Sequence, residues 1–209
     1  MWLGHTPLAP YHELRCHFWW RFILSYGGGE MTDRGAHIID LAQLGAGTDD
    51  TVPVEFEATG TRSTTSLYNA FMDYKFENVY ANGVRMIGEN KGPRGLKFEG
   101  SGGSIFIHIH GAKLEADPPG LLEEKVAEGE IQLGRSPGHH RNFLDSVKSR
   151  QQPVASAEVG HRTATICHLN NIAMLTGRKL IWDPKTEQIA NDSEANALLA
   201  PAMRSPWRL

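Results

Sequence analysis

An α+β fold is expected from this sequence, with one open, mostly antiparallel sheet and helices packed on one face of it. Three observations favour this fold. Five successive segments between residues 54 and 110 alternate apolar and polar side chains, as half-buried strands do. Helical spacing of apolar residues occurs before and after these segments. Two glycine-containing turn sequences, at 82–83 and 100–103, separate alternating segments and favour hairpins between them.

The composition is that of an ordinary globular protein. The 209 residues are 40% hydrophobic and 22% charged, with a net charge of −3 and no Lys/Arg cluster. Nucleic acids and anionic membranes usually bind basic surfaces, so neither is expected as a partner. No apolar run reaches the roughly 18 residues of a membrane helix. Residues 1–10 do not resemble a signal peptide, so the chain as it stands is expected to be cytoplasmic.

The first elements are an aromatic segment and a helix. Residues 1–27 are rich in aromatic rings, and we expect a loop followed by a strand or buried segment over 16–26. These rings either pack in the core or line part of a pocket. The glycine triplet at 27–29 breaks the chain, and apolar spacing then predicts a helix over 31–45.

The alternating segments are predicted to be strands of one sheet. They are residues 54–58, 70–77, 84–86, 96–99 and 105–110. Asn82-Gly83 predicts a hairpin turn, and the glycine-rich segment 100–103 predicts another between Phe98 and Ile105. One face of this sheet is apolar, and the other is mostly polar and is expected to meet water or a partner.

Loops and helices follow the strands within what we expect to be a single domain over 1–209. Residues 111–136 are acidic and contain Pro118-Pro119, which predicts a long surface loop. Helices are predicted over about 140–147 and 157–175, the second with Gly177 as its C-cap. Its predicted apolar side comprises Ala164, Cys167, Ile172 and Leu175. The tail, 182–209, is expected to be extended, with a short helix near 193–200.

Asp33 and His37 are the best candidates for chemistry. They are four residues apart on the first predicted helix, so they lie on the same face. The carboxylate can hold the imidazole in one tautomer, and the imidazole can then take a proton from a substrate hydroxyl. A glycine triplet just upstream would let the backbone approach a ligand closely. The spacing equally fits a structural pair in which Asp33 favours the helix N-terminus.

The other motifs point away from a metal or nucleotide site. His108 and His110 share one strand face, but no HExxH motif is present and no cysteine accompanies the histidines. We expect no metal, and metal-assisted chemistry by the histidines is the weaker hypothesis. The glycines at 100–103 are followed by a predicted strand, whereas a dinucleotide loop opens a helix. The two cysteines form no CxxC motif; a disulfide between them is possible, but buried free thiols are expected.

Five stretches together resemble one family. Residues 27–40 read GGGEMTDRGAHIID, which resembles the GGGxxxDxGxHxxD signature of the Gfo/Idh/MocA oxidoreductases. The others resemble an EGTxG hairpin, an HxNFLDxI helix, an EVGHR…HLxNIA helix and a bacterial-type extended C-terminus, at 98–105, 140–147, 158–173 and 182–209. They occur in family order along essentially the whole chain. The chain therefore resembles the C-terminal, substrate-binding and oligomerisation domain of that family.

The resemblance implies an activity, a cofactor and an interface. Family enzymes pair this α/β domain with a Rossmann domain that holds NAD or NADP. The signature residues that bind and deprotonate a sugar hydroxyl match Asp33 and His37. The open sheet face commonly joins subunits, which implies a homo-oligomer through a polar face. On this chain that face is expected to carry Glu55, Lys75, Arg85 and His108.

The family's glycine-rich fingerprint and its Glu-Lys-Pro motif are upstream elements, and neither occurs in these 209 residues. We therefore expect the substrate-binding half of an NAD(P)-dependent oxidoreductase that acts on a sugar or cyclitol hydroxyl, without cofactor or activity on its own. His37 would be the base and Asp33 its orienter. Tyr11, His17, Trp20 and Arg21 would line the pocket. The alternative is a non-catalytic carbohydrate-binding or dimerisation domain. The sequence does not fix the compartment of the intact protein, since relatives of this subgroup are often exported.

Overall fold

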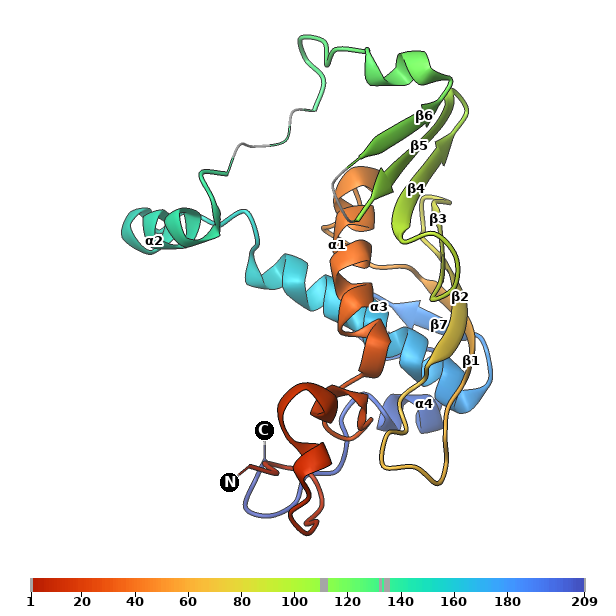
Figure 1. Cartoon of the computed structure of the whole chain (residues 1–209), viewed down its shortest axis with the longest axis vertical. Helices are drawn as coiled ribbons and strands as arrows, with labels where there is room; N and C mark the ends of the chain where they lie inside the picture. Colours follow the sequence, from red (N-terminus) through yellow and green to blue (C-terminus); the bar gives the residue numbers. More distant parts are fainter. Residues whose placement is uncertain (1, 110–112, 132, 134–135, 209) are drawn as a thin grey trace. The chain divides into compact units, whose positions relative to one another are not determined.

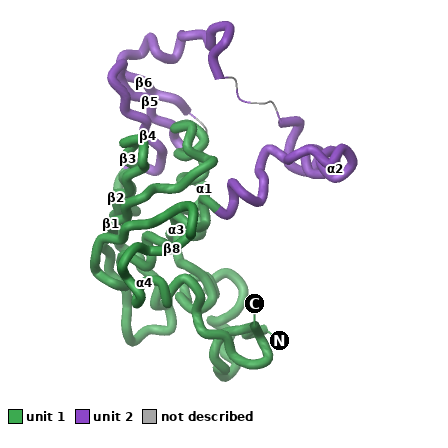
Figure 2. Tube along the Cα trace, turned by 180° about the vertical axis from the view of Figure 1, so that it is seen from behind, with its two compact units in different colours: residues 1–92, 162–209 green, residues 93–161 purple. Residues whose placement is uncertain are grey.

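The computed structural model describes residues 2–109, 113–131, 133 and 136–208. Within the expected single domain, the chain divides into two compact units (Figure 2). The first contains residues 1–92 and 162–209, and the second contains residues 93–161.

The first unit is built on a five-stranded antiparallel sheet in the order β3-β2-β1-β7-β8 (Figure 1). Its strands are β1 (Glu55–Thr61), β2 (Asp73–Val79), β3 (Arg85–Glu89), β7 (Leu180–Asp183) and β8 (Gln188–Ile189). The three predicted strands of this region are confirmed, and so is the turn at Asn82-Gly83, where Gly83 has a φ of +87°. Along β1, Phe56 and Ala58 are buried while Glu57 and Thr59 are exposed, which is the period-two pattern expected of a sheet covered on one face.

Helices cover the apolar face of this sheet. They are α1 (Arg34–Ala46), the part of α3 (Ala157–Thr176) from Arg162 onward, and α4 (Ser193–Ala197). The buried cluster joins Ile39 of α1 and Ile166 of α3 to Phe56 and Leu180 of the sheet. Fully burying such a side chain stabilises the fold by about 1.5–3 kcal/mol. The α+β class, with helices on one sheet face, is thus confirmed, although Ala164, which was expected on the apolar side of α3, is exposed.

The N-terminal segment is not a strand. Residues 13–22 form two 3₁₀ helices, η1 (Glu13–Arg15) and η2 (His17–Phe22), closed by local hydrogen bonds such as Ile23 N–H to the Trp20 carbonyl. A strand needs a neighbouring edge to satisfy its backbone groups. Here the Phe22 carbonyl instead accepts the N–H groups of Asn69 and Ala70, at 3.1 and 3.0 Å. Most of the rings of η2 stay outside the core, because only Phe22 of this helix is buried.

The second unit contains a separate three-stranded sheet, where we expected a continuation of the first. Its strands are β4 (Gly95–Gly100), β5 (Gly103–His108) and β6 (Leu114–Asp117), in that order. The expectation of a plain surface loop over 111–136 is wrong at β6 and at the 3₁₀ helix η4 (Pro119–Leu122). Residues 114–117 alternate apolar and acidic side chains and pair with β5, an alternation too short to stand out in sequence. His110 lies outside the described residues.

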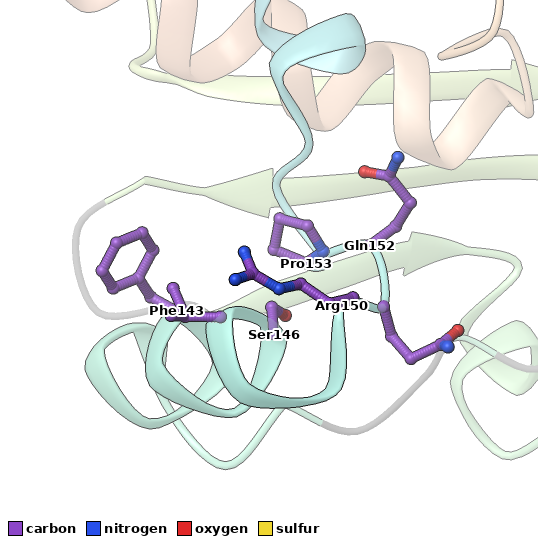
Figure 3. A pocket seen from close by; sticks show the side chains of 7 residues that line it. Phe143, Ser146, Arg150, Gln152 and Pro153 are labelled. Atoms are coloured by element: carbon purple, nitrogen blue, oxygen red, sulfur yellow. The ribbon is translucent and has the colours of Figure 1, made fainter.

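An amphipathic helix, α2 (His139–Ser149), also belongs to the second unit and matches the predicted 140–147 helix. None of its residues is buried, and Phe143, Leu144 and Val147 are exposed. A hollow of about 290 Å³ lies at its C-terminal end (Figure 3). The lining residues are Phe143, Ser146, Val147, Arg150, Gln151, Gln152 and Pro153.

The tail is more structured than expected. It contributes the end of β7, then β8 and α4, before an irregular segment from Leu198 onward. Arg204 ties that segment to the start of the chain, because its Nη2 donates to the Gly4 carbonyl at 2.6 Å and its Nε to the Thr6 carbonyl at 3.0 Å. The segments around Gly4 and Arg204, near the two ends of the chain, therefore lie side by side (Figure 1). Among the described helices, none has the length and apolar character of a membrane span.

Candidate functional site

Asp33 stands immediately before α1, as its N-cap residue. Its side chain makes no capping hydrogen bond to the helix. Instead its Oδ2 lies 2.8 Å from Nε of Arg21, in an ion pair whose side chains are 34% and 17% exposed, respectively. The structure thus brings together two of the predicted site residues, one from η2 and one from the start of α1.

Arg21 is held in place by more than Asp33. Its Nη1 donates to the Phe18 carbonyl at 2.7 Å, and its guanidinium carbon lies 3.5 Å from the centre of the Phe18 ring. The Nε–H group does not meet hydrogen-bond geometry toward Asp33, so the pair is mainly electrostatic. A guanidinium that stacks on a ring and faces a carboxylate has little freedom to reorient.

His37 is exposed on α1, one turn beyond Asp33. No hydrogen bond or ion pair joins it to Asp33 within the described part of the chain, where the partner of the carboxylate is Arg21. The idea that Asp33 orients the imidazole therefore has no contact to support it here. Both side chains remain partly accessible at the start of one helix.

The remaining predicted pocket residues are spread along the N-terminal segment. Tyr11 is exposed and precedes η1, and His17 begins η2 with a φ of +54°. Trp20 packs near Gly27, since a Cβ on that glycine would lie 3.1 Å from the Trp20 ring. Within the described ranges, none of these three residues forms a hydrogen bond or ion pair with Asp33 or His37, and of the four only Arg21 contacts the candidate site.

The glycine triplet serves the packing of the chain itself, which corrects the expectation that it leaves room for a ligand. A Cβ on Gly28 would lie 2.2 Å from Cγ2 of Thr32. Gly29 has a φ of +72°, and its Cβ would lie 2.5 Å from Cβ of Ala70. The backbone turn that places Asp33 at the start of α1 therefore needs small residues at these positions.

Asn171 of α3 is a residue that sequence reasoning did not single out. It is buried, and its Nδ2 donates to the Gly28 carbonyl at 2.9 Å. The signature around the glycine triplet and the HLxNIA stretch are therefore linked by a direct contact. A polar residue on an otherwise buried helix face was the available signal in the sequence.

A polar network fixes the middle of α1. Thr163 of α3 donates to Asp40 Oδ1 at 3.1 Å. The buried amide of Gln43 hydrogen-bonds with the Tyr80 hydroxyl at 3.1 Å. Burial raises the pKa of Tyr80 to about 12, so the phenol stays protonated. These contacts join α1 to α3 and to Tyr80, the residue that follows β2.

Tyr74 of β2 lies under the first turn of α1. Its hydroxyl is 3.9 Å from the position that a Cβ on Gly35 would take. Burial, followed by the negative charge of Glu30, raises the pKa of Tyr74 to about 12. From the sequence, Tyr74 was expected only to lie on the apolar face of a strand. Its position next to α1 depends on the tertiary fold and could not be predicted.

The structure places the histidines and the glycine-rich turn that the sequence raised as possible metal and nucleotide motifs. Among the described residues, no group of three His, Cys, Asp or Glu side chains could hold an ion, and His108 pairs with Glu115 at 3.0 Å. The turn at 100–103 joins β4 to β5 as predicted. It therefore offers no helix N-terminus to a pyrophosphate, which a dinucleotide loop requires.

Comparison with known proteins gives a family and a fold. The whole chain, residues 1–209, matches the Gfo/Idh/MocA model described as "Oxidoreductase family, C-terminal alpha/beta domain". Among solved structures, an NAD-binding protein from Listeria innocua aligns with a TM-score of 0.57 at 17% identity, over 85% of this chain and 55% of that one. A putative oxidoreductase from Erwinia carotovora atroseptica aligns with a TM-score of 0.51 at 14% identity, over 74% and 50%.

At these identities the structural matches establish the fold alone. The chain spans about half the length of each of the two solved structures. No curated protein matches it.

Proposed function

Because this chain belongs to the Gfo/Idh/MocA oxidoreductases, as their C-terminal alpha/beta domain, we propose that it is the substrate-binding half of an NAD(P)-dependent enzyme. The substrate would be a sugar or cyclitol that reacts at a hydroxyl-bearing carbon. One observation carries the proposal: the GGG…Asp33…His37 signature forms a tight turn and a helix whose first turns leave both side chains accessible. The similarity to an NAD-binding protein supports the cofactor class.

In this proposal His37 accepts the proton of the reacting hydroxyl through its imidazole, which suits general-base chemistry near neutral pH. Asp33 accepts a hydrogen bond from a neighbouring hydroxyl, and Arg21 holds the carboxylate at 2.8 Å. Asp33 therefore contacts the substrate in this proposal and does not orient the imidazole of His37, because its carboxylate is paired with Arg21. The nicotinamide that accepts hydride would be bound by the Rossmann domain with which family enzymes pair this domain.

We also propose that two copies associate through the open face of the five-stranded sheet. Across β1, β2 and β3 this face presents Glu57, Glu77 and Ile87 in register, and Ile87 is 68% exposed. Arg85 pairs with Glu77 at 2.6 Å on the same face. An exposed apolar residue among charged ones suits a wet protein–protein contact. His108, which was expected on this face, lies on the three-stranded sheet and is not part of it.

Binding measurements on the 209-residue chain test the catalytic-half proposal. Myo-inositol and glucose are titrated into the wild type, His37→Ala and His139→Ala, and binding is followed by the amide signals in two-dimensional NMR. Saturable binding that His37→Ala weakens at least fivefold and His139→Ala leaves unchanged is the expected result. Polyol binding that is indifferent to His37→Ala would favour the non-catalytic carbohydrate-binding alternative. Absence of polyol binding would contradict both readings.

A further inference from the structure

We infer that the Arg21–Asp33 ion pair determines substrate specificity: it makes the start of α1 charge-balanced, so that uncharged polyols bind there and anionic sugars are disfavoured. Sugar phosphates and uronates are the anionic class in question. The inference rests on the proposed function, because it takes Asp33 as a group that faces the substrate.

The guanidinium of Arg21 is already engaged. A free arginine binds a phosphate or carboxylate through two parallel N–H donors. Here Nε faces Asp33 at 2.8 Å, Nη1 donates to the Phe18 carbonyl, and the Phe18 ring covers one face of the guanidinium. Its positive charge is compensated inside the protein, so an incoming anion gains little from it.

A second charge pair lies beside the first. Arg34, the first residue of α1, pairs with Glu30 at 3.2 Å. Arg21 and Arg34, the two arginines near Asp33, are thus each paired with a carboxylate. An anionic sugar placed against Asp33 would meet a partly buried like charge, and that repulsion is stronger in a partly desolvated site than in water.

The Arg21–Asp33 pair can bind two neighbouring hydroxyl groups of one ligand. A hydroxyl both donates and accepts hydrogen bonds, whereas a carboxylate only accepts and a guanidinium only donates. Asp33 is 34% exposed, and the contacts of Arg21 named above use two of its three nitrogens. One hydroxyl can therefore donate to the carboxylate while its neighbour accepts from the guanidinium. A vicinal diol presents those two groups side by side.

Arg15 is the control cation of this segment. Its Nη1 donates to the Tyr26 hydroxyl at 3.2 Å, and no acidic side chain pairs with it among the ion pairs of the described residues. If the net charge of the N-terminal segment governed the preference for neutral over anionic ligands, replacing Arg15 would change that preference as much as altering the Arg21–Asp33 pair.

The test compares two neutral ligands, myo-inositol and glucose, with two anionic ones, glucose 6-phosphate and glucuronate. Each is titrated by NMR into the 209-residue chain and into Asp33→Asn, Arg21→Gln and Arg15→Gln, at low and high salt. We expect the wild type to bind the neutral ligands at least tenfold more tightly. Asp33→Asn frees the Arg21 charge, so it should shift this ratio at least tenfold toward the anions, and salt should shrink that shift.

The other two variants complete the test. Arg21→Gln leaves Asp33 uncompensated, so it should widen the preference for neutral ligands at least threefold, even if Asp33→Asn fails to fold. Arg15→Gln should leave the preference unchanged. A wild type that prefers anions, an unchanged ratio in both pair variants, or a shift caused by Arg15→Gln would overturn the inference while leaving the proposed function intact. A wild type that binds neither class would overturn both.

Discussion

The side-chain amide of Asn171 donates a 2.9 Å hydrogen bond to the carbonyl of Gly28, 143 residues earlier in the chain. This contact joins the end of α3 to the turn that precedes α1. In this chain it links two distant stretches of the family signature: one supplies the turn and the other anchors it.

Loss of that anchor should destabilise the fold. Asn171→Ala leaves the buried Gly28 carbonyl without this donor, and such a loss costs about 1–3 kcal/mol. Urea denaturation of the purified chain measures it. Gln152→Ala, at an exposed position, is the control and should change stability by less than about 0.5 kcal/mol. Equal stability of the two variants would show that the hydrogen bond is not needed.

Two glycines should respond in opposite directions to alanine. Gly29→Ala forces a Cβ to within 2.5 Å of Ala70 at a φ of +72°, so it should cost about 1–3 kcal/mol. Gly160→Ala, within α3 and with open space around its Cβ, should stabilise the chain by about 0.5–1 kcal/mol. Thermal unfolding of both variants gives the comparison. If Gly29→Ala were more stable than the wild type, Gly29 could not have a positive φ and lie against Ala70.

The two cysteines should differ in reactivity. Burial raises the pKa of Cys167 to about 12, whereas Cys16 is half-buried. Only thiolates react rapidly with Ellman's reagent, so the native chain at pH 8 should release one equivalent and the urea-unfolded chain two. Two fast equivalents from the native chain would place Cys167 in contact with solvent.

The Arg178–Asp192 ion pair should make the stability of the fold decrease in acid. Hydrogen bonds from Arg178 lower the pKa of Asp192 from 3.8 to about 2. Because the folded pKa lies below the unfolded one, the pair stabilises the fold above pH 4, and this contribution is lost between about pH 4 and 2. Arg178→Gln should therefore lower the urea midpoint at pH 6 and converge with wild type toward pH 2.5. A constant difference at all pH values would exclude this pair as the cause.

The open sheet face should control association. Ile87→Glu places a charge opposite Glu77 on that face, so it should weaken self-association at least tenfold. Ile131→Glu, at a position that is 90% exposed in the second unit, is the control and should have no effect. Sedimentation equilibrium measures both. Association that survives Ile87→Glu would require another interface.

Sequence patterning was most informative for elements long enough to show a period. The alternation of Phe56 and Ala58 with Glu57 predicted β1, and the helical spacing around Ile39 predicted α1. The four residues of β6 and the two of β8 are too short for a period to appear. The aromatic segment, expected to be a strand or a buried segment, forms 3₁₀ helices, and none of the described strands pairs with it.

The site was predictable in its residue types but not in its contacts. Asp33 and His37 follow from the signature, and their positions at the start of α1 follow from the helix. The partnership of Asp33 with Arg21 does not follow, because it depends on how η2 folds back toward α1. Tyr74 was similarly hidden, because its place under α1 depends on how the helix crosses the sheet.

The most direct measurement is the ring signals of His37 and His139 in histidine-labelled chain during a titration with myo-inositol. If the start of α1 binds polyol as proposed, the His37 signals move saturably with the same dissociation constant as the amide signals, while those of His139 stay fixed. If the His37 signals do not move while the ligand binds, the polyol site lies elsewhere, and His37 is not the group that accepts the hydroxyl proton.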